Sequence, residues 1–182
     1  MGLISVTDPV ERVRRCLEKA GYTLPLRHIE ETIFTVDEAA EAVGVPPCQI
    51  LKSLLFAVDD GAAMVLVLMS GSNRVNDKKV KKFLGARKVR MATEEAIYEF
   101  CGFRPGGIPP VGYSNQPMTL VDEDIFAYDL LWAAAGTDHD LFSISPEELI
   151  RLTAGKRIDV KKNATRPSWR SEERRVGKEC RS

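Results

Sequence analysis

Lys52 occupies an unusual position for a lysine. The run 50–58 around it is continuous and apolar, which is typical of a buried strand. Because side chains alternate between the two faces of a strand, Lys52 shares its face with apolar residues. These neighbours are Ile50, Leu54, Phe56 and Val58. An ammonium group in such surroundings must be paired, must reach a cavity or must have a lowered pKa. Lys52 is therefore the first candidate for chemistry.

A loop rich in glycine and proline is the second candidate. It reads Gly106-Gly107-Ile108-Pro109-Pro110-Val111-Gly112. Glycine allows positive φ and close approach of the backbone, and proline stiffens the chain. Such a loop can direct N–H groups at an oxyanion or a phosphate. It can equally be a connection that only turns corners, although a loop of this length inside a compact domain favours a function.

Two other segments could contact a ligand. Gly136-Thr137-Asp138-His139 follows an apolar strand whose small residues would permit a substrate to approach. Its histidine either faces a cleft or is an exposed turn residue, whereas His28 is interpreted as structural. The basic run 78–82, with Arg74 close before it, either grips phosphates or is a solvated helix face. Within this patch we single out Arg74, Lys78 and Lys81.

Several familiar chemistries are not indicated. The sequence contains no GxSxG motif, no P-loop and no dinucleotide fingerprint, so covalent catalysis and nucleotide cofactors are not expected. The four cysteines form no CxxC pair and have no spacing suited to zinc. We therefore expect neither a metal nor a cofactor.

The chain has 182 residues, with 44% hydrophobic and 29% charged residues, which is the composition of an ordinary globular protein. It has no apolar run long enough to cross a bilayer and no signal-peptide pattern at its start, so we expect a cytoplasmic protein. The segment 166–182 has no apolar period and resembles translated vector sequence. With six Lys/Arg against three Asp/Glu in this tail, the rest of the chain is three units negative. We predict one domain over 1–165 and a non-native or disordered tail.

Capping and periodicity predict the elements that must position these residues. Helices are expected to begin at Asp8 and Thr35, each with a capping box, and at Asp77, Thr93 and Ser145. Strands are expected near 23–29, 50–58, 63–69, 87–91, 118–121, 130–135, 141–144 and 158–160, with the second and third forming a hairpin. Because the order lacks regular βαβ alternation, the fold class is α+β, a mixed α/β domain in which helices flank a curved mixed sheet.

The segments described above occur together in an order that resembles the YbaK/prolyl-tRNA-synthetase-associated editing family of aminoacyl-tRNA deacylases. The resemblance covers about 35–153. It is carried by the segments 52–56, 71–76, 89–92, 102–112 and 136–139. Each piece alone is unspecific, and the ordered set is strong.

The resemblance implies a trans-editing hydrolase that removes a wrong amino acid, such as Ala, Cys, Ser or Thr, from a tRNA, above all the proline tRNA. It implies that Lys52 is needed for activity and that the backbone of Gly106 and Gly107 holds the substrate carbonyl. The implied partners are a mischarged tRNA and an aminoacyl-tRNA synthetase, with no membrane, and the protein is a monomer or homodimer. The implied substrate-binding residues are Phe34, Ser53, Pro110, Gly112, Gly136, Thr137 and His139.

The chain departs from the known branches at one informative position. Ser53 stands where the cysteine-editing branch has Thr and the alanine-editing branch has Asn. This departure leaves the amino acid open. A non-catalytic tRNA-binding or synthetase-associated module, and a hydrolase of small esters or amides, remain alternatives.

Overall fold

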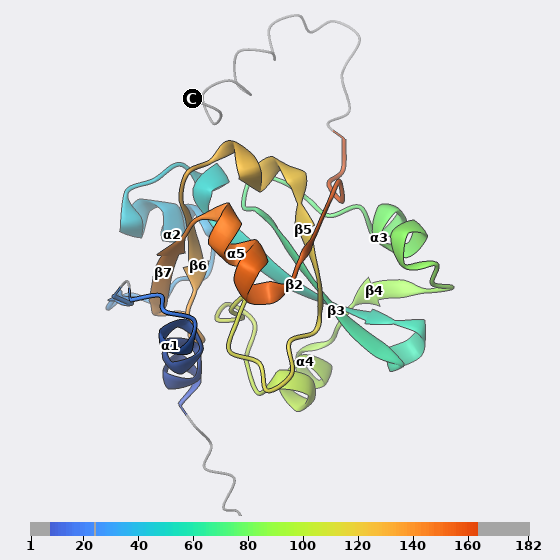
Figure 1. Ribbon diagram of the computed structural model, residues 1–182, viewed down its shortest axis with the longest axis horizontal. Coiled ribbons are helices and arrows are strands. Elements are labelled where there is room, and N and C mark those ends of the chain that lie inside the picture. The colour runs from blue at the N-terminus through green and yellow to red at the C-terminus, as the bar shows by residue number, and fades with distance from the viewer. Residues whose placement is uncertain (1–7, 24, 164–182) are drawn as a thin grey trace, which may run out of the picture.

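The computed structural model describes residues 8–23 and 25–163 (Figure 1). Its helices are α1 (Pro9–Lys19), α2 (Val36–Val43), α3 (Asp77–Leu84), α4 (Glu94–Cys101) and α5 (Pro146–Thr153), with short 3-10 turns η1 (Pro47–Gln49), η2 (Asp59–Gly61) and η3 (Glu123–Ala127). Its strands are β1 (Arg27–His28), β2 (Leu51–Val58), β3 (Ala63–Ser70), β4 (Val89–Met91), β5 (Met118–Asp122), β6 (Leu131–Ala134), β7 (Asp140–Ile144) and β8 (Lys156–Ile158). Within the described ranges, no helix has the length and apolar character needed to cross a bilayer.

The strands form two sheets. The larger sheet has the order β4-β2-β3-β5-β8; its β4-β2 and β2-β3 pairs are antiparallel, and its β3-β5 and β5-β8 pairs are parallel. The smaller sheet, β1-β7-β6, is antiparallel. This arrangement confirms the mixed α/β class. In place of one continuous curved sheet, the two sheets meet at an isolated bridge between Ile50 and Trp132.

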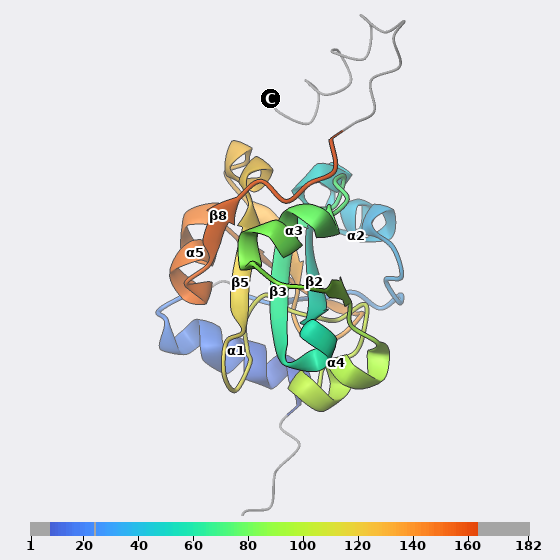
Figure 2. The same ribbon diagram turned by 90° about the vertical axis from the view of Figure 1, so that its right-hand side faces the viewer.

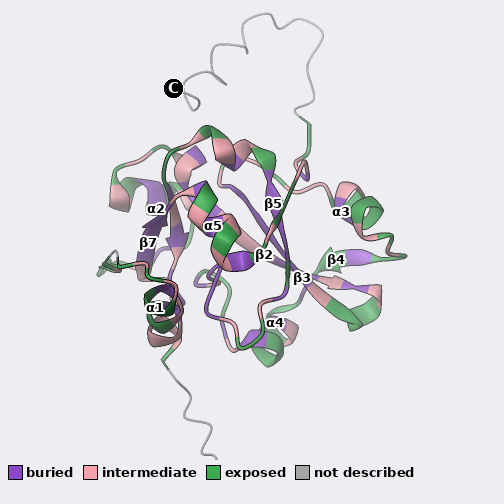
Figure 3. Ribbon diagram, viewed as in Figure 1, coloured by how far each residue is buried: buried purple, intermediate pink, exposed green. Residues whose placement is uncertain are grey.

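Three apolar clusters hold the elements together. Figure 2 shows α3 lying in front of the large sheet. Leu55 of β2 points into the largest cluster, where the two sheets pack against α1, α4 and α5. Phe56 points to the opposite face, which Val80 of α3 covers. Ile50 belongs to a third cluster with α2. Figure 3 shows that the buried residues concentrate in the strands, whereas α1 and α3 expose their outer faces. The alternation in β2 therefore puts Lys52 on the sheet face that carries α3.

Capping residues set the helix boundaries. Thr35 and Glu38 form the predicted capping box at α2. At α1, Asp8 accepts from the backbone N–H groups of Val10 and Glu11 as predicted, but the side chain of Glu11 pairs with arginines on the same helix. The cap of α3 is Asn76, one residue before the predicted Asp77.

Two short strands differ from the prediction. β1 covers only Arg27–His28 of the predicted 23–29, because only these residues face β7. The last strand is Lys156–Ile158 instead of 158–160. The N–H of Val160 donates to a carboxylate oxygen of Asp122 at 3.0 Å. This N–H is therefore not available to pair with a neighbouring strand.

Candidate active site

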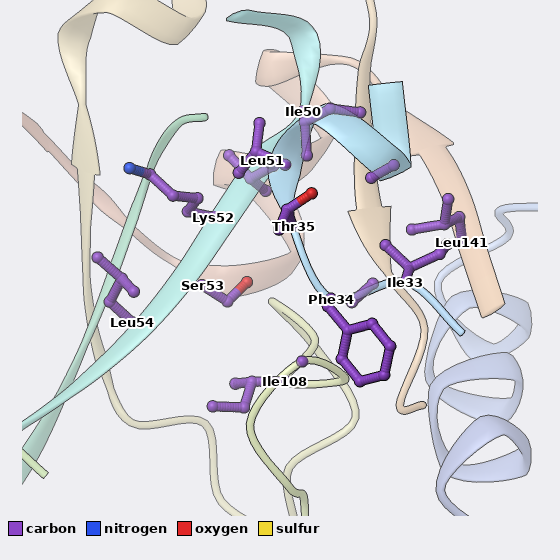
Figure 4. Close-up of a pocket in the computed structure, with 14 residues that line it drawn as sticks. Ile33, Phe34, Thr35, Ile50, Leu51, Lys52, Ser53, Leu54, Ile108 and Leu141 are labelled. Carbon is purple, nitrogen blue, oxygen red and sulfur yellow. The ribbon is translucent and has the colours of Figure 1, made fainter. Parts of the chain in front are cut away.

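A cavity of about 280 Å³ lies beside the N-terminal half of β2 (Figure 4). β4 pairs only with the stretch 56–58 of β2, and the one backbone bridge to β6 described at this edge is that of Ile50. Between these contacts the edge of β2 is open. The cavity is lined by Ile33, Phe34, Thr35, Val36, Ala39, Ile50, Leu51, Lys52, Ser53, Leu54, Gly106, Ile108, Ala134 and Leu141. It thus brings together the lysine strand and the glycine loop that the sequence singled out.

Lys52 is partly buried and has no carboxylate partner among the described residues. Its ammonium group donates a hydrogen bond to the backbone carbonyl of Asn73. Burial lowers the pKa of Lys52, and the nearby Arg74 guanidinium lowers this pKa further. In Figure 4 the amine points away from Phe34, toward one end of the cavity. Lys52 is therefore a cation at the rim of an apolar cavity whose charge no neighbouring carboxylate neutralises.

Ser53 points to the other face of β2. Its Oγ is buried and has no hydrogen-bond partner, and it is the one such side-chain atom found in the described part of the chain. The carbonyl of Leu55 accepts from the N–H of Ala92, on the β4 side. Because backbone polar groups alternate along a strand, the N–H and C=O of Ser53 turn to that same, open side. Ser53 therefore offers polar groups to the cavity that the protein itself leaves unused.

Phe34 and Gly106 complete the cavity. Phe34 precedes α2, and its side chain is strongly exposed, with 79% of its surface accessible. The glutamate of the α2 capping box fixes its backbone by accepting the Phe34 N–H at 2.7 Å. Gly106 has φ +92°, a conformation that favours glycine, and its N–H has no hydrogen-bond partner within the residues described. An exposed aromatic ring and an unpaired amide thus border the same space.

Gly107 serves a different purpose from Gly106. Its N–H donates to the carbonyl of Arg104 at 3.1 Å, so this amide is used inside the loop. A Cβ at Gly107 would lie 2.6 Å from the Cα of Thr137. Glycine is therefore required here because the loop packs directly on the 136–139 turn. Of the two expected backbone donors, the structure leaves the Gly106 amide available and engages the Gly107 amide.

The 136–139 turn lies behind the loop and outside the lining of the cavity. Gly136 and Thr137 border a neighbouring hollow of about 320 Å³ together with Gly107. The hydroxyl of Thr137 donates to a carboxylate oxygen of Asp140 at 2.5 Å and accepts the N–H of His139. The ring of His139 pairs through Nδ1 with the carbonyl of Ile29 at 3.0 Å. The imidazole is thus held at the β1–β7 edge and does not share the cavity with Lys52.

Pro110 and Gly112 also lie outside the cavity. The buried Pro110 accepts a hydrogen bond from the Gln116 side chain through its carbonyl at 3.0 Å. Gly112 has φ +95°, and a Cβ there would meet Val13 of α1 at 3.1 Å. Both residues shape the loop from behind.

The basic patch forms part of the surface on the α3 side of the sheet. Arg74, Lys78 and Lys81 are all exposed, and none makes an ion pair within the described ranges. Lys79 differs, because its ammonium lies 2.8 Å from a carboxylate oxygen of Asp159. Arg74 also acts on the pKa of Lys52, so the patch extends to the rim of the cavity.

Sequence reasoning did not single out two groups of residues at the candidate site. Ile33 and the α2 residues of the apolar lining received no role in the site. Asn73 and the buried Asp122 received no role, although Asn73 contacts both Lys52 and the 122–124 segment. An apolar strand followed by Asp122-Glu123-Asp124 is typical of a solvated turn, so no local pattern signalled burial. No group of three or more His, Cys, Asp or Glu side chains placed to hold a metal ion occurs in the regions that the structure describes.

Comparison with known proteins agrees with this geometry. A family model described as an aminoacyl-tRNA editing domain matches residues 30–152. The chain is 40% identical over 94 residues, 50% of its length, to a proline–tRNA ligase from Limosilactobacillus fermentum, and spans only 16% of that ligase. An uncharacterised Bacillus subtilis protein, YwhH, is 30% identical over 135 residues, which cover 74% of this chain and 85% of that protein.

A solved structure of similar size gives the same result. The crystal structure of a candidate trans-editing enzyme for prolyl tRNA synthetase superimposes with a TM-score of 0.80 at 38% identity. The match covers 87% of this chain and 100% of that one. The sequence match, the shared fold and the cavity formed by its lysine strand and glycine loop lead to one assignment: this chain belongs to the aminoacyl-tRNA editing domain family.

Proposed function

We propose that this domain hydrolyses the ester between a wrongly attached small amino acid and the terminal adenosine of a tRNA. The observation that carries the proposal is the cavity in which Lys52, Ser53 and Gly106 meet among apolar side chains. Its volume of about 280 Å³ lies at the lower end for small-molecule sites, which suits a small acyl group such as Ala, Cys, Ser or Thr. The relationship to proline–tRNA ligases supports the proline tRNA as carrier.

The chemistry requires little beyond positioning, because an ester of a ribose is easier to hydrolyse than an amide. In the proposed mechanism the Gly106 N–H stabilises the oxyanion that forms when water attacks the carbonyl. Lys52, beside Arg74, binds the carbonyl or the terminal phosphate as a cation. The vicinal ribose hydroxyl takes part in removing the proton from water. Thr137 and His139 contact the adenosine from the far side of the loop.

The amino-acid end of the substrate is assigned to the interior of the cavity. There the unpartnered Ser53 Oγ can bond to a polar group of the acyl moiety, while Phe34 closes the mouth. The exposed cations Lys78 and Lys81 provide a path for the phosphates of the acceptor end on the α3 side of the sheet.

A non-catalytic tRNA-binding module of the same fold is the second candidate. Two contacts favour it: Lys52 is bound to the Asn73 carbonyl, and His139 is bound to the Ile29 carbonyl. In such a module these groups would be structural, and the mischarged tRNA would be bound without being hydrolysed.

A deacylation assay separates the two candidates. The purified domain is incubated with a panel of tRNAs charged with Ala, Cys, Ser, Thr or Pro, and release of the amino acid is followed. We expect release of at least one small amino acid, and loss of this release in Lys52→Ala with an unchanged circular dichroism spectrum. Lys88→Ala, just before β4 and in contact with Asp60 in the turn of the β2–β3 hairpin, is the matched control and should retain full activity.

Three results would contradict the proposal. Full activity in Lys52→Ala would remove the lysine from it. Binding of every charged tRNA without release would favour the non-catalytic module, and equal activity on free aminoacyl esters would favour a general ester hydrolase.

A further inference from the structure

A polar cluster connects the cavity beside β2 to the end of β5, on the other side of β3 in the large sheet. Asn73 accepts from Lys52 through its backbone carbonyl and donates through its side-chain amide to two carboxylates. The amide nitrogen lies 2.9 Å from Asp124 Oδ2 and 3.4 Å from Asp122 Oδ2. One residue therefore separates the cationic lysine from a pair of acidic groups.

The acidic pair is itself held from several sides. Asp122 is fully buried; its Oδ1 accepts the Val160 N–H at 3.0 Å, and its Oδ2 accepts the Asp124 N–H at 3.4 Å. Asp124 Oδ1 lies 2.7 Å from the ammonium of Lys161. These contacts come from η3 and from the strand end after β8, which fixes the carboxylates independently of Asn73.

We propose that Asn73 is a positioning residue for Lys52, which directs the ammonium group with a neutral carbonyl while its side-chain amide keeps Asp122 and Asp124 from pairing with the lysine. The proposal rests on the proposed function for its effect on catalysis. Its effect on the charge of Lys52 stands independently.

The physical reason lies in the kind of acceptor. A carbonyl oxygen fixes the direction of an ammonium group without cancelling its charge, whereas a carboxylate would form an ion pair and reduce the attraction for an anionic substrate. Lys52 also lies near the positive Arg74. A bound phosphate or oxyanion would therefore supply the negative charge that these two cations attract. The side-chain amide of Asn73 saturates the acidic pair with two donors that carry no net charge.

The cluster also explains the position of the loop 71–76. The Asn73 N–H donates to the Ser70 carbonyl at 3.0 Å, and the Arg74 carbonyl accepts from the Lys162 N–H at 2.7 Å. A Cβ at Gly71 would lie 2.6 Å from the Pro47 carbonyl oxygen. The loop is thus anchored at both ends, and the carbonyl that holds Lys52 has a fixed direction.

The test measures the charge of Lys52 directly. The protein is reductively methylated with ¹³C-formaldehyde, the Lys52 signal is assigned by its absence in Lys52→Ala, and its chemical shift is followed against pH. In the wild type the pKa of Lys52 should lie below 10.5, because burial and Arg74 both lower it. In Asn73→Ala this pKa should rise, since the fixed carboxylates are then no longer saturated by the side-chain amide and their negative charge acts more strongly on the ammonium.

Three further variants isolate the cause. Asn73→Ala/Asp124→Asn should bring the pKa of Lys52 back down, since one of the two carboxylates is then removed. Ser72→Ala, an exposed change in the same loop, should leave this pKa unchanged. Asn73→Ser, which keeps a short donor at the same place, should give an intermediate value and provides a second variant if Asn73→Ala does not fold.

Kinetics test the consequence for the reaction. For the preferred mischarged tRNA we expect kcat of Asn73→Ala to fall on the order of 100-fold, the size of effect that a misplaced catalytic group produces, with KM changed much less. An unchanged pKa of Lys52 in folded Asn73→Ala or Asn73→Ser overturns the inference. A wild-type protein without deacylase activity overturns the proposed function instead, and the pKa measurement still decides the role of Asn73.

Discussion

The hydroxyl of Ser53 is buried in the protein without a partner, although its neighbour in the chain supplies the cation of the same cavity. A buried polar group that makes no hydrogen bond lowers the stability of the fold. Retaining such a group at the edge of a cavity is understandable if a ligand supplies the missing partner. At the residue scale, Ser53 therefore links stability to binding.

Ser53→Ala should consequently make the empty protein more stable and the enzyme less active. Removing the unsatisfied hydroxyl is expected to raise the free energy of unfolding by about 1 kcal/mol, measured by urea denaturation without tRNA. Deacylation should fall, because the hydroxyl proposed to bond to the acyl group is lost.

Ser70→Ala is the matched control. Its hydroxyl is also buried but donates to the Cys48 carbonyl at 2.7 Å. This variant should lose about 1 kcal/mol of stability. A loss of stability of the same size in Ser53→Ala would show that Ser53 has a partner inside the protein.

The sequence allowed the position of Lys52 to be predicted, because strand alternation alone puts it on an apolar face. The roles of Ser53 and Asn73 could not be predicted in this way. Ser53 borders the cavity because β4 pairs with only three residues of β2 and leaves the edge beside Ser53 open. The contacts of Asn73 join β2 to η3, which lie far apart in the chain.

Helix α3 carries a positive surface on a described chain whose net charge is three units negative. Its outward cations Lys78 and Lys81 are not neutralised by described acidic residues, whereas Lys79 is tied to Asp159. The helix covers the sheet face that also carries Lys52. A strand of nucleic acid bound along α3 can therefore reach the rim of the cavity through Arg74.

Changing Lys78 and Lys81 together to Glu should weaken tRNA binding. If each lysine contacts one phosphate, the slope of log K against log salt should become less steep by about 1.5, as expected when two phosphate contacts are lost. Fluorescence anisotropy over a salt series measures both quantities.

The control makes the same change of charge elsewhere. Arg14 and Arg15 lie on α1, on the opposite side of the molecule from α3 (Figure 1). Their joint change to Glu should leave the salt slope unchanged. If the α3 variant keeps both the affinity and the slope of the wild type, its lysines are only a solvated surface.

Elements with strong local signals were predicted well, and those that depend on partners were not. The capping box at Thr35 and the glycine that ends α3 give boundaries that local chemistry determines. β1 and β8 have only two and three residues, and each exists because a distant strand offers an edge. Strands of this length are too short to show the alternation of apolar and polar residues from which a strand is predicted.

At the scale of the molecule, α1 supports the glycine loop from outside the region that matches the family. The match begins at residue 30, yet Val13 and Leu17 of α1 are buried in the main core. Val13 also packs against Gly112, and Gly136 packs against Pro9. The N-terminal helix is thus part of the structure that holds the loop and the turn in place. The predicted tail 166–182 lies outside the described residues.

Val13→Ala should therefore affect both stability and activity. Loss of two buried methyl groups is expected to lower the free energy of unfolding by about 2 kcal/mol. Activity should also fall, because the loop that carries Gly106 loses its support. Val10→Ala, at a partly exposed position on the same helix, should cost clearly less in both measurements. Equal effects of the two changes would contradict a specific role for Val13.

The pairing of β1 with β7 has a consequence for how the chain is made. His28 and Asp140 are 112 positions apart, whereas the β2–β3 hairpin closes locally. During synthesis the hairpin can form while most of the chain is still in the ribosome, but the smaller sheet must wait for the later half. The wall of the cavity contributed by Ala134 and Leu141 arrives at that late stage. A nascent chain interrupted before residue 140 would lack this wall, so the enclosed cavity around the lysine should form only after the second half of the domain has been made.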